Sequence, residues 1–176
     1  MIRLLLIGTL AFGAATASAQ ENAQEPAPKG EQADTPPAIT AGGDPLALIA
    51  AIYEAYEADR VNIDHVFSRR LQGLLDDDAK KTPEGDVGTI DWDVFVNGNN
   101  FEISKVKVAL LAKSAVRARV RARFDNMKKP QEITFDLVLE DGAWHIDEVS
   151  STRKGERWTM SKILGGAPDA FPDRKE

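Results

Sequence analysis

The sequence predicts an α+β domain in which N-terminal helices pack on one face of a four-stranded antiparallel meander sheet. Two segments before residue 82 carry apolar residues at helical spacing, and the region 101–149 alternates apolar and polar residues with a period of two. Turn-forming residues separate the alternating segments, as in an antiparallel meander. Helices followed by a run of strands are typical of the α+β class.

The N-terminal 19 residues have the pattern of a secretory signal peptide. Arg3 precedes an apolar run over residues 4–15, and Ala17-Ser18-Ala19 provides the cleavage site. The run is shorter than the about 20 apolar residues of a membrane-spanning helix, so no membrane span is expected. Gln20 follows the cleavage site and the chain contains no cysteine, which excludes a lipoprotein and disulfides. We therefore expect a soluble protein that is periplasmic or secreted.

Composition divides the rest of the chain into three parts. Residues 20–43 are rich in Pro, Glu, Gln and Ala and have no apolar period, which predicts a disordered linker. A single domain is expected over residues 44–168, and a polar tail over 169–176. The formal net charge of −6 argues against nucleic acid as a partner. The oligomeric state is not predicted.

Two helices are predicted at the start of the domain. Asp44 is suited to cap a helix with proline at its first position, and an apolar stripe then continues to about Asp59. Ser68 is suited to cap a second helix, which the Thr82-Pro83-Glu84-Gly85 stretch ends.

Four strands are predicted after the helices, at about 102–111, 116–124, 132–140 and 144–149. The second strand reads VRARVRARF, so its four arginines share one face. Asp141-Gly142 predicts a two-residue turn between the third and fourth strands. Keeping the apolar faces together then predicts these cross-strand neighbours: Arg123 with Glu132, Arg119 with Asp136, Lys107 with Arg119, Lys105 with Arg121, and Asp136 with Asp147.

The arginine face has two interpretations. Cross-strand ion pairs on an exposed face mainly keep a protein soluble. Alternatively, the cations without a predicted acidic neighbour form a patch for an acidic protein or an anionic lipid or glycan. These residues are Lys105, Lys107, Arg117 and Arg121. No aromatic residue interleaves the arginines, as single-stranded nucleic acid binding would favour.

Catalytic and metal-binding signals are weak. Asp64, His65 and Asp93 are the candidate acid–base residues, but no nucleophile accompanies them. Asp91 to Glu102 has the oxygen spacing of a calcium loop, although Phe95 and Val96 occupy positions that need an oxygen ligand and a glycine. We expect no metal site and no cofactor.

Five aromatic residues are candidates for a ligand pocket between helix and sheet. Their rings are large and, in Tyr and Trp, carry a polar group that needs a partner when buried. The alternative is that they fill the core. The residues are Tyr53, Tyr56, Trp92, Phe95 and Trp144.

Four motifs together resemble a family of small bacterial envelope proteins of unknown function that carries a D-x-D-x-F motif. They are the capped helix from Asp44, the pattern S-x-x-L-x-x-L-L from Ser68, Asp91-Trp92-Asp93-Val94-Phe95, and the segment 142–149. The resemblance implies a cone-shaped fold similar to nuclear transport factor two and ketosteroid isomerase. It implies a binding protein, an enzyme or an assembly factor, because fold alone does not settle function.

The function expected from the sequence is a non-enzymatic domain that binds a protein or a small ligand. One alternative is an isomerase- or hydrolase-like enzyme with an acid–base group in the cone pocket. Another is an immunity or accessory factor for a second envelope protein.

Overall fold

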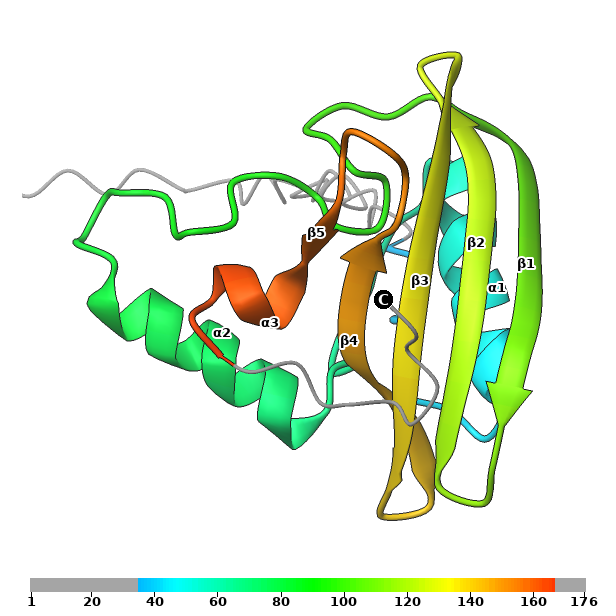
Figure 1. The fold of residues 1–176 in the computed structure, drawn as a ribbon, viewed down its shortest axis with the longest axis horizontal. Coiled ribbons are helices and arrows are strands. Elements are labelled where there is room, and N and C mark those ends of the chain that lie inside the picture. The colour runs from blue at the N-terminus through cyan, green and yellow to red at the C-terminus, as the bar shows by residue number, and fades with distance from the viewer. Residues whose placement is uncertain (1–34, 167–176) are drawn as a thin grey trace, which may run out of the picture. The chain divides into compact units, whose positions relative to one another are not determined.

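The computed structural model describes residues 35–166 (Figure 1). The predicted signal peptide, residues 20–34 of the predicted linker and the predicted tail lie outside the described residues. The elements, in chain order, are α1 (Pro45–Glu57), α2 (Arg69–Lys81), β1 (Ile103–Lys113), β2 (Arg117–Asn126), β3 (Lys129–Glu140), β4 (Ala143–Ser151), β5 (Trp158–Thr159) and α3 (Met160–Ile163).

The strands form one antiparallel sheet in the order β1-β2-β3-β4-β5. The α+β class and the meander order are confirmed, but the predicted strand number of four is wrong. The fifth strand has only two residues, with Thr159 opposite Ser150 and Trp158 opposite Ser151. A strand this short is too brief to show a period of two, which is why sequence alternation does not reveal it.

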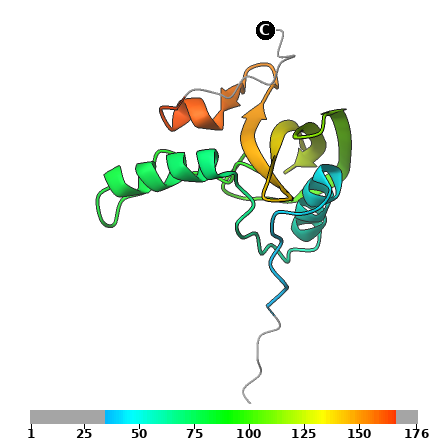
Figure 2. The same cartoon turned by 90° about the horizontal axis from the view of Figure 1, so that it is seen from below.

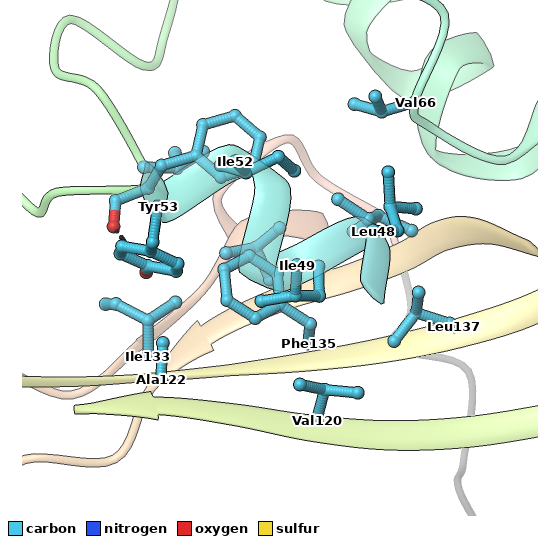
Figure 3. Close-up of a cluster of buried hydrophobic side chains, with 14 of the residues drawn as sticks. Leu48, Ile49, Ile52, Tyr53, Val66, Val120, Ala122, Ile133, Phe135 and Leu137 are labelled. Atoms are coloured by element: carbon cyan, nitrogen blue, oxygen red, sulfur yellow. Dashed lines mark hydrogen bonds between the residues drawn. The ribbon is translucent and has the colours of Figure 1, made fainter. Parts of the chain in front are cut away.

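Helix α1 begins where its capping residue predicts and covers one face of the sheet. The Asp44 carboxylate accepts hydrogen bonds from the backbone N–H groups of Leu46 at 3.0 Å and Ala47 at 2.9 Å. Ile49 and Tyr53 are fully buried against the sheet, as Figure 3 shows for the cluster that also contains Val120 and Phe135. Burial of these apolar side chains is the main favourable contribution to folding.

Helix α2 also begins at its predicted cap but does not cover the same face. The Ser68 hydroxyl accepts a hydrogen bond from the backbone N–H of Leu71 at 3.1 Å. Leu71 is the buried residue of this helix, which carries mostly exposed charged side chains and contacts β4. Figure 2 shows α2 extending away from the sheet. The prediction that the helices pack together on one sheet face therefore holds for α1 and is wrong for α2.

The predicted register is confirmed between β2 and β3, where Arg119 lies opposite Asp136 and Arg123 opposite Glu132. It also holds beside the Asp141-Gly142 turn, but changes further along β4. There Asp136 lies opposite Glu148 instead of Asp147, because a bulge inserts one extra residue into β4.

The predicted register between β1 and β2 is wrong. Lys107 lies opposite Arg123, not Arg119, and Lys105 is not paired with Arg121. Two register shifts interrupt β1, one between Ser104 and Lys107 and one between Leu110 and Ala112. The sequence predicts register from an unbroken period of two, and each shift breaks that period.

The ordered domain begins before Asp44. Ile39 forms a parallel bridge with Ile63, and Gly42 forms an antiparallel bridge with Trp144. The last part of the predicted linker therefore contacts the domain through backbone hydrogen bonds, which need no apolar period. No helix among residues 35–166 is long and apolar enough to cross a membrane.

Candidate functional site: a cationic cleft on the charged face of the sheet

A cleft of about 980 Å³ lies between the arginine face of the sheet and the segment β5–α3. It is about twice the volume of two depressions beside α2, which measure about 480 and 520 Å³. Residues of β1, β2, β3 and β4 line one wall, and residues 157–163 line the other. We call this space the cationic cleft, for its four basic side chains: Arg119, Arg121, Arg157 and Lys162.

Arg119 is held in place by a carboxylate on the neighbouring strand. Its Nε lies 2.5 Å from Asp136 Oδ1, and its second terminal nitrogen lies 3.1 Å from Oδ2. The two side chains are only 14% and 7% exposed. A guanidinium that binds a carboxylate through two parallel hydrogen bonds has a fixed orientation. Arg119 therefore forms a rigid part of the cleft wall.

The other three cations are not neutralised in this way. Within residues 35–166, Arg121, Arg157 and Lys162 form no ion pair. Arg121 is half-buried on β2, whereas Arg157 and Lys162 are exposed on the opposite wall. Cations on two walls of a recess reinforce each other's attraction for an anion.

The single carboxylate among the described cleft-lining residues is Glu132, which already has partners. It accepts hydrogen bonds from the Nε of Arg123 and, at 2.9 Å, from the hydroxyl of Thr152. Partial burial acts to raise the pKa of Glu132, but these hydrogen bonds and the charges of Arg123 and Arg121 hold it below its ordinary value. Four cations and one paired carboxylate leave the described lining with a net positive charge.

Hydroxyl groups lie between the cations. The lining includes the hydroxyl side chains of Thr134 and Ser150 on the sheet and of Thr159 on β5. Hydroxyls donate and accept hydrogen bonds, so they suit the oxygen atoms of an anionic group. The cleft thus offers both charge and neutral hydrogen-bonding groups.

The wall made by β5–α3 is fixed by buried polar contacts to β4 and by a part-buried contact to the loop before β1. Glu148 of β4 accepts a hydrogen bond from the backbone N–H of Ser161 at 3.0 Å and a second from the Ser161 hydroxyl. The indole N–H of Trp158 donates to Asn97 Oδ1 at 2.8 Å. These contacts hold a helix of four residues that is too short to be stable by itself.

The base of α2 is tied to β4 by the bulge residue Asp147. Its Oδ1 accepts a hydrogen bond from the Ser68 hydroxyl at 2.6 Å and another from Arg70 Nε at 3.0 Å. Arg70 also approaches Glu148, at 3.9 Å. The bulge therefore points an acidic side chain toward α2, while Glu148 contacts α3.

The structure separates the four cations of the patch predicted from the sequence. Arg121 lies in the cationic cleft. Lys105 and Lys107 line a smaller depression of about 360 Å³, where Lys105 forms a 2.7 Å ion pair with Asp125 that raises the pKa of the lysine. Arg117 lines neither space.

Four of the five predicted pocket aromatics lie in the core. Tyr53, Tyr56, Phe95 and Trp144 are each at most 7% exposed. The hydroxyl of Tyr53 donates to the carbonyl of Phe95 at 2.7 Å, and burial strongly raises the pKa of Tyr53. Space for a ligand among these rings would require side chains to move. Trp92 packs edge-to-face on Trp158, so it supports the β5 wall of the cleft instead.

The three predicted acid–base residues are in different settings. Asp64 and His65 lie 3.4 Å apart and are largely exposed. Asp93 accepts hydrogen bonds from the Tyr56 hydroxyl and, at 2.9 Å, from the backbone N–H of Phe95. The second contact is the turn bond expected of an aspartate in a loop. Within residues 35–166 no group of three or more His, Cys, Asp or Glu side chains is arranged to hold a metal ion.

Sequence reasoning did not identify Arg157 and Lys162 as site residues. The available signal was the basic stretch that follows the fourth predicted strand, Arg153 to Lys162, which carries four cations. Its position over the arginine face depends on the chain reversing after β4, and no periodic pattern predicts that reversal.

Comparison with protein-family models, with curated proteins and with solved structures gave no match. The function is therefore inferred from the geometry of the cationic cleft.

Proposed function

We propose that this protein is a non-enzymatic binding domain that holds a small anionic ligand in the cationic cleft. One observation carries the proposal: Arg121, Arg157 and Lys162 approach one recess from β2, from the loop before β5 and from α3. A recess lined by cations that lack ion-pair partners within the described residues is suited to anions.

The charge of the whole chain supports this interpretation. The formal net charge is −6, so the protein as a whole repels anions. A concentration of positive charge in one recess is then a local feature and not a reflection of composition. Arginine side chains also recognise carboxylate and phosphate groups through paired hydrogen bonds, which gives geometric selectivity in addition to attraction.

The chemistry of the lining favours binding over catalysis. The described residues that line the cleft include hydroxyl groups but no histidine or cysteine, and the single carboxylate is already hydrogen-bonded. Nucleophilic catalysis by a hydroxyl needs a base within hydrogen-bonding reach. Glu132 lies within reach of the Thr152 hydroxyl, but it also pairs with Arg123 and its pKa is lowered, so it is a weak base. The groups present instead hold and orient a ligand.

The proposal includes the location and the fold class expected from the sequence. We place the protein in the bacterial envelope, exported by a signal peptide that is cleaved after Ala19, and we assign it a cone-shaped fold like that of nuclear transport factor two. The signal pattern of residues 1–19 supports export. N-terminal sequencing of the protein from a periplasmic fraction tests the cleavage point, and recovery of the uncleaved chain from the cytoplasm would contradict it.

The test of binding is an NMR titration of the ¹⁵N-labelled protein with citrate at constant ionic strength. Citrate is expected to shift the amide signals of β2, β4 and α3, the elements around the cleft. The double variant R157Q/K162Q should bind citrate at least about tenfold more weakly, because charge-assisted hydrogen bonds are lost.

The matched control is Lys107→Gln. It removes a positive charge from an exposed lysine on the same side of the sheet but outside the cationic cleft. Citrate affinity should stay within about twofold of the unmodified protein, as for a distant surface charge screened by salt. Equal citrate affinity in R157Q/K162Q and in the unmodified protein would contradict the proposed function.

A further inference from the structure

The cationic cleft also contains apolar side chains, which binding of an anion does not require. Leu111, Trp158 and Ile163 are part of the lining. Leu111 lies in β1, next to the arginines of β2, and is 45% exposed. Exposure of a leucine side chain to water is unfavourable, so a ligand that covers it gains binding free energy.

A register shift in β1 places Leu111 at the cleft. The ladder pairs Leu110 with Val120 and Ala112 with Arg119, so Leu111 has no partner on β2. An extra residue in a strand redirects a side chain, and such irregularities are common next to binding sites. Here the irregularity brings an apolar group to a wall that otherwise carries Arg119 and Arg121.

The other two apolar groups come from the opposite wall. The polar atom of Trp158 is already bonded to Asn97, so its ring contributes hydrocarbon surface. Ile163, the last residue of α3, is half-buried. Hydrocarbon therefore lines both walls of the cationic cleft.

We propose that the ligand of the cationic cleft is an anionic amphiphile, a molecule with one anionic group and a hydrocarbon chain. This inference rests on the proposed function, because it assigns the anionic group to the same cations. The chain lies along Leu111 and Ile163, and the anionic group contacts Arg121, Arg157 or Lys162.

An amphiphile explains the lining better than a purely hydrophilic polyanion. A polyphosphate or an acidic sugar gains nothing from Leu111 and Ile163 and leaves them in water. A hydrocarbon chain removes their surface from water and is stabilised in turn. The cleft volume of about 980 Å³ is at the upper end of the range for small-molecule sites, which leaves room for a chain as well as a head group.

The test compares three probes by calorimetry on the full protein: inorganic phosphate, butyl phosphate and octyl phosphate, the last below its micelle concentration. Each methylene that the apolar walls cover fully should increase the binding affinity about fourfold. Octyl phosphate is expected to bind at least about tenfold more tightly than butyl phosphate, which corresponds to partial coverage of the added chain.

The variant L111N/I163N should reduce the difference between octyl and butyl phosphate to less than about threefold while leaving inorganic phosphate binding unchanged. Val116→Asn is the control, since Val116 is 54% exposed and is not part of the described cleft lining. It should keep the full dependence on chain length. Circular dichroism checks that each variant is folded. If L111N/I163N does not fold, the single variant L111N replaces it, because Leu111 is at an exposed position.

The outcomes separate this inference from the proposed function. Equal binding of all three probes, each weakened in R157Q/K162Q, overturns the amphiphile and leaves the anion site intact. Equal binding of octyl phosphate and neutral octyl glucoside, unaffected by R157Q/K162Q, overturns both. Sedimentation with phosphatidylglycerol vesicles without binding of octyl phosphate overturns the inference in favour of a membrane surface.

Discussion

The contact between Glu148 and Ser161 is predicted to hold the β5–α3 wall of the cationic cleft on the sheet. Both side chains are almost completely buried, at 1% and 0% exposed. The Glu148 carboxylate accepts hydrogen bonds from the backbone N–H and from the hydroxyl of Ser161. We expect Glu148→Gln, which keeps the volume of the side chain, to lower the free energy of unfolding.

The magnitude follows from the contacts. A hydrogen bond to a charged group contributes about 1.5–3 kcal/mol, and a buried donor left without a partner costs about 1–3 kcal/mol. The glutamine keeps one acceptor oxygen for two Ser161 donors, so one bond is lost or weakened. Arg70 lies 3.9 Å from Glu148, and loss of its attraction to the carboxylate acts in the same direction. We therefore expect E148Q to lower the free energy of unfolding by about 2–3 kcal/mol.

A double-mutant cycle with Ser161→Ala isolates the contact. S161A alone should cost about 1–2 kcal/mol, and the coupling between the two changes should be about 1 kcal/mol or more, since the residues are in direct contact. Urea unfolding gives the free energies. Hydrogen exchange of the β5 and α3 amides should show faster local opening in both variants while the amides of β2 and β3 stay protected.

Glu156→Gln is the matched control, because it makes the same chemical change at an exposed position near β5. Glu156 pairs with Arg153 at 3.0 Å, where the two side chains are 45% and 33% exposed. Exposed pairs contribute about 0–1 kcal/mol, so E156Q should have little effect. Additive effects of E148Q and S161A, or equal effects of E148Q and E156Q, would refute the reasoning.

Two further predictions concern the termini of elements. Asp44→Ala should lower the free energy of unfolding at neutral pH by about 1 kcal/mol through loss of the helix cap. The backbone N–H of Ala47 holds the pKa of Asp44 below its usual value of 3.8, so this contribution is present above pH 3.8 and lost as pH falls through the lowered pKa. Urea unfolding at neutral pH and at pH 3 should show the difference shrinking; a constant difference would contradict the cap. The β2–β3 turn residues Met127 and Lys128 both have positive φ, at 49° and 64°, so the double substitution M127N/K128G should stabilise the protein by about 1–2 kcal/mol. Thermal unfolding tests it, and a lower midpoint would contradict the role of turn strain.

Local patterns predicted the helix starts and most of the central register correctly. Asp44 and Ser68 cap their helices because short polar side chains bond to backbone groups two or three residues away. Arg119 faces Asp136 because alternation and the need to keep apolar faces together leave one register between β2 and β3.

The same rules failed where the period is interrupted. The extra residues at Asp147 and Leu111 change which side chains lie opposite each other on neighbouring strands. An alternating sequence pattern does not indicate where such extra residues occur. The aromatic residues were ambiguous for a different reason. A ring at helical spacing looks the same in sequence whether it lines a pocket or fills the core, and only packing distinguishes the two.

The sequence by itself determined the class of the domain, the start of each long helix, the arginine face and its main acidic partners. Each of these depends on contacts between residues that are close in the chain or joined by a short turn. The tertiary structure alone decided that Arg157, Lys162 and Ile163 meet Arg121 and Leu111 across one cleft. Their proximity depends on the reversal of the chain after β4, which brings β5 and α3 over the arginine face. The hydrogen bonds between Glu148 and Ser161 hold that segment there.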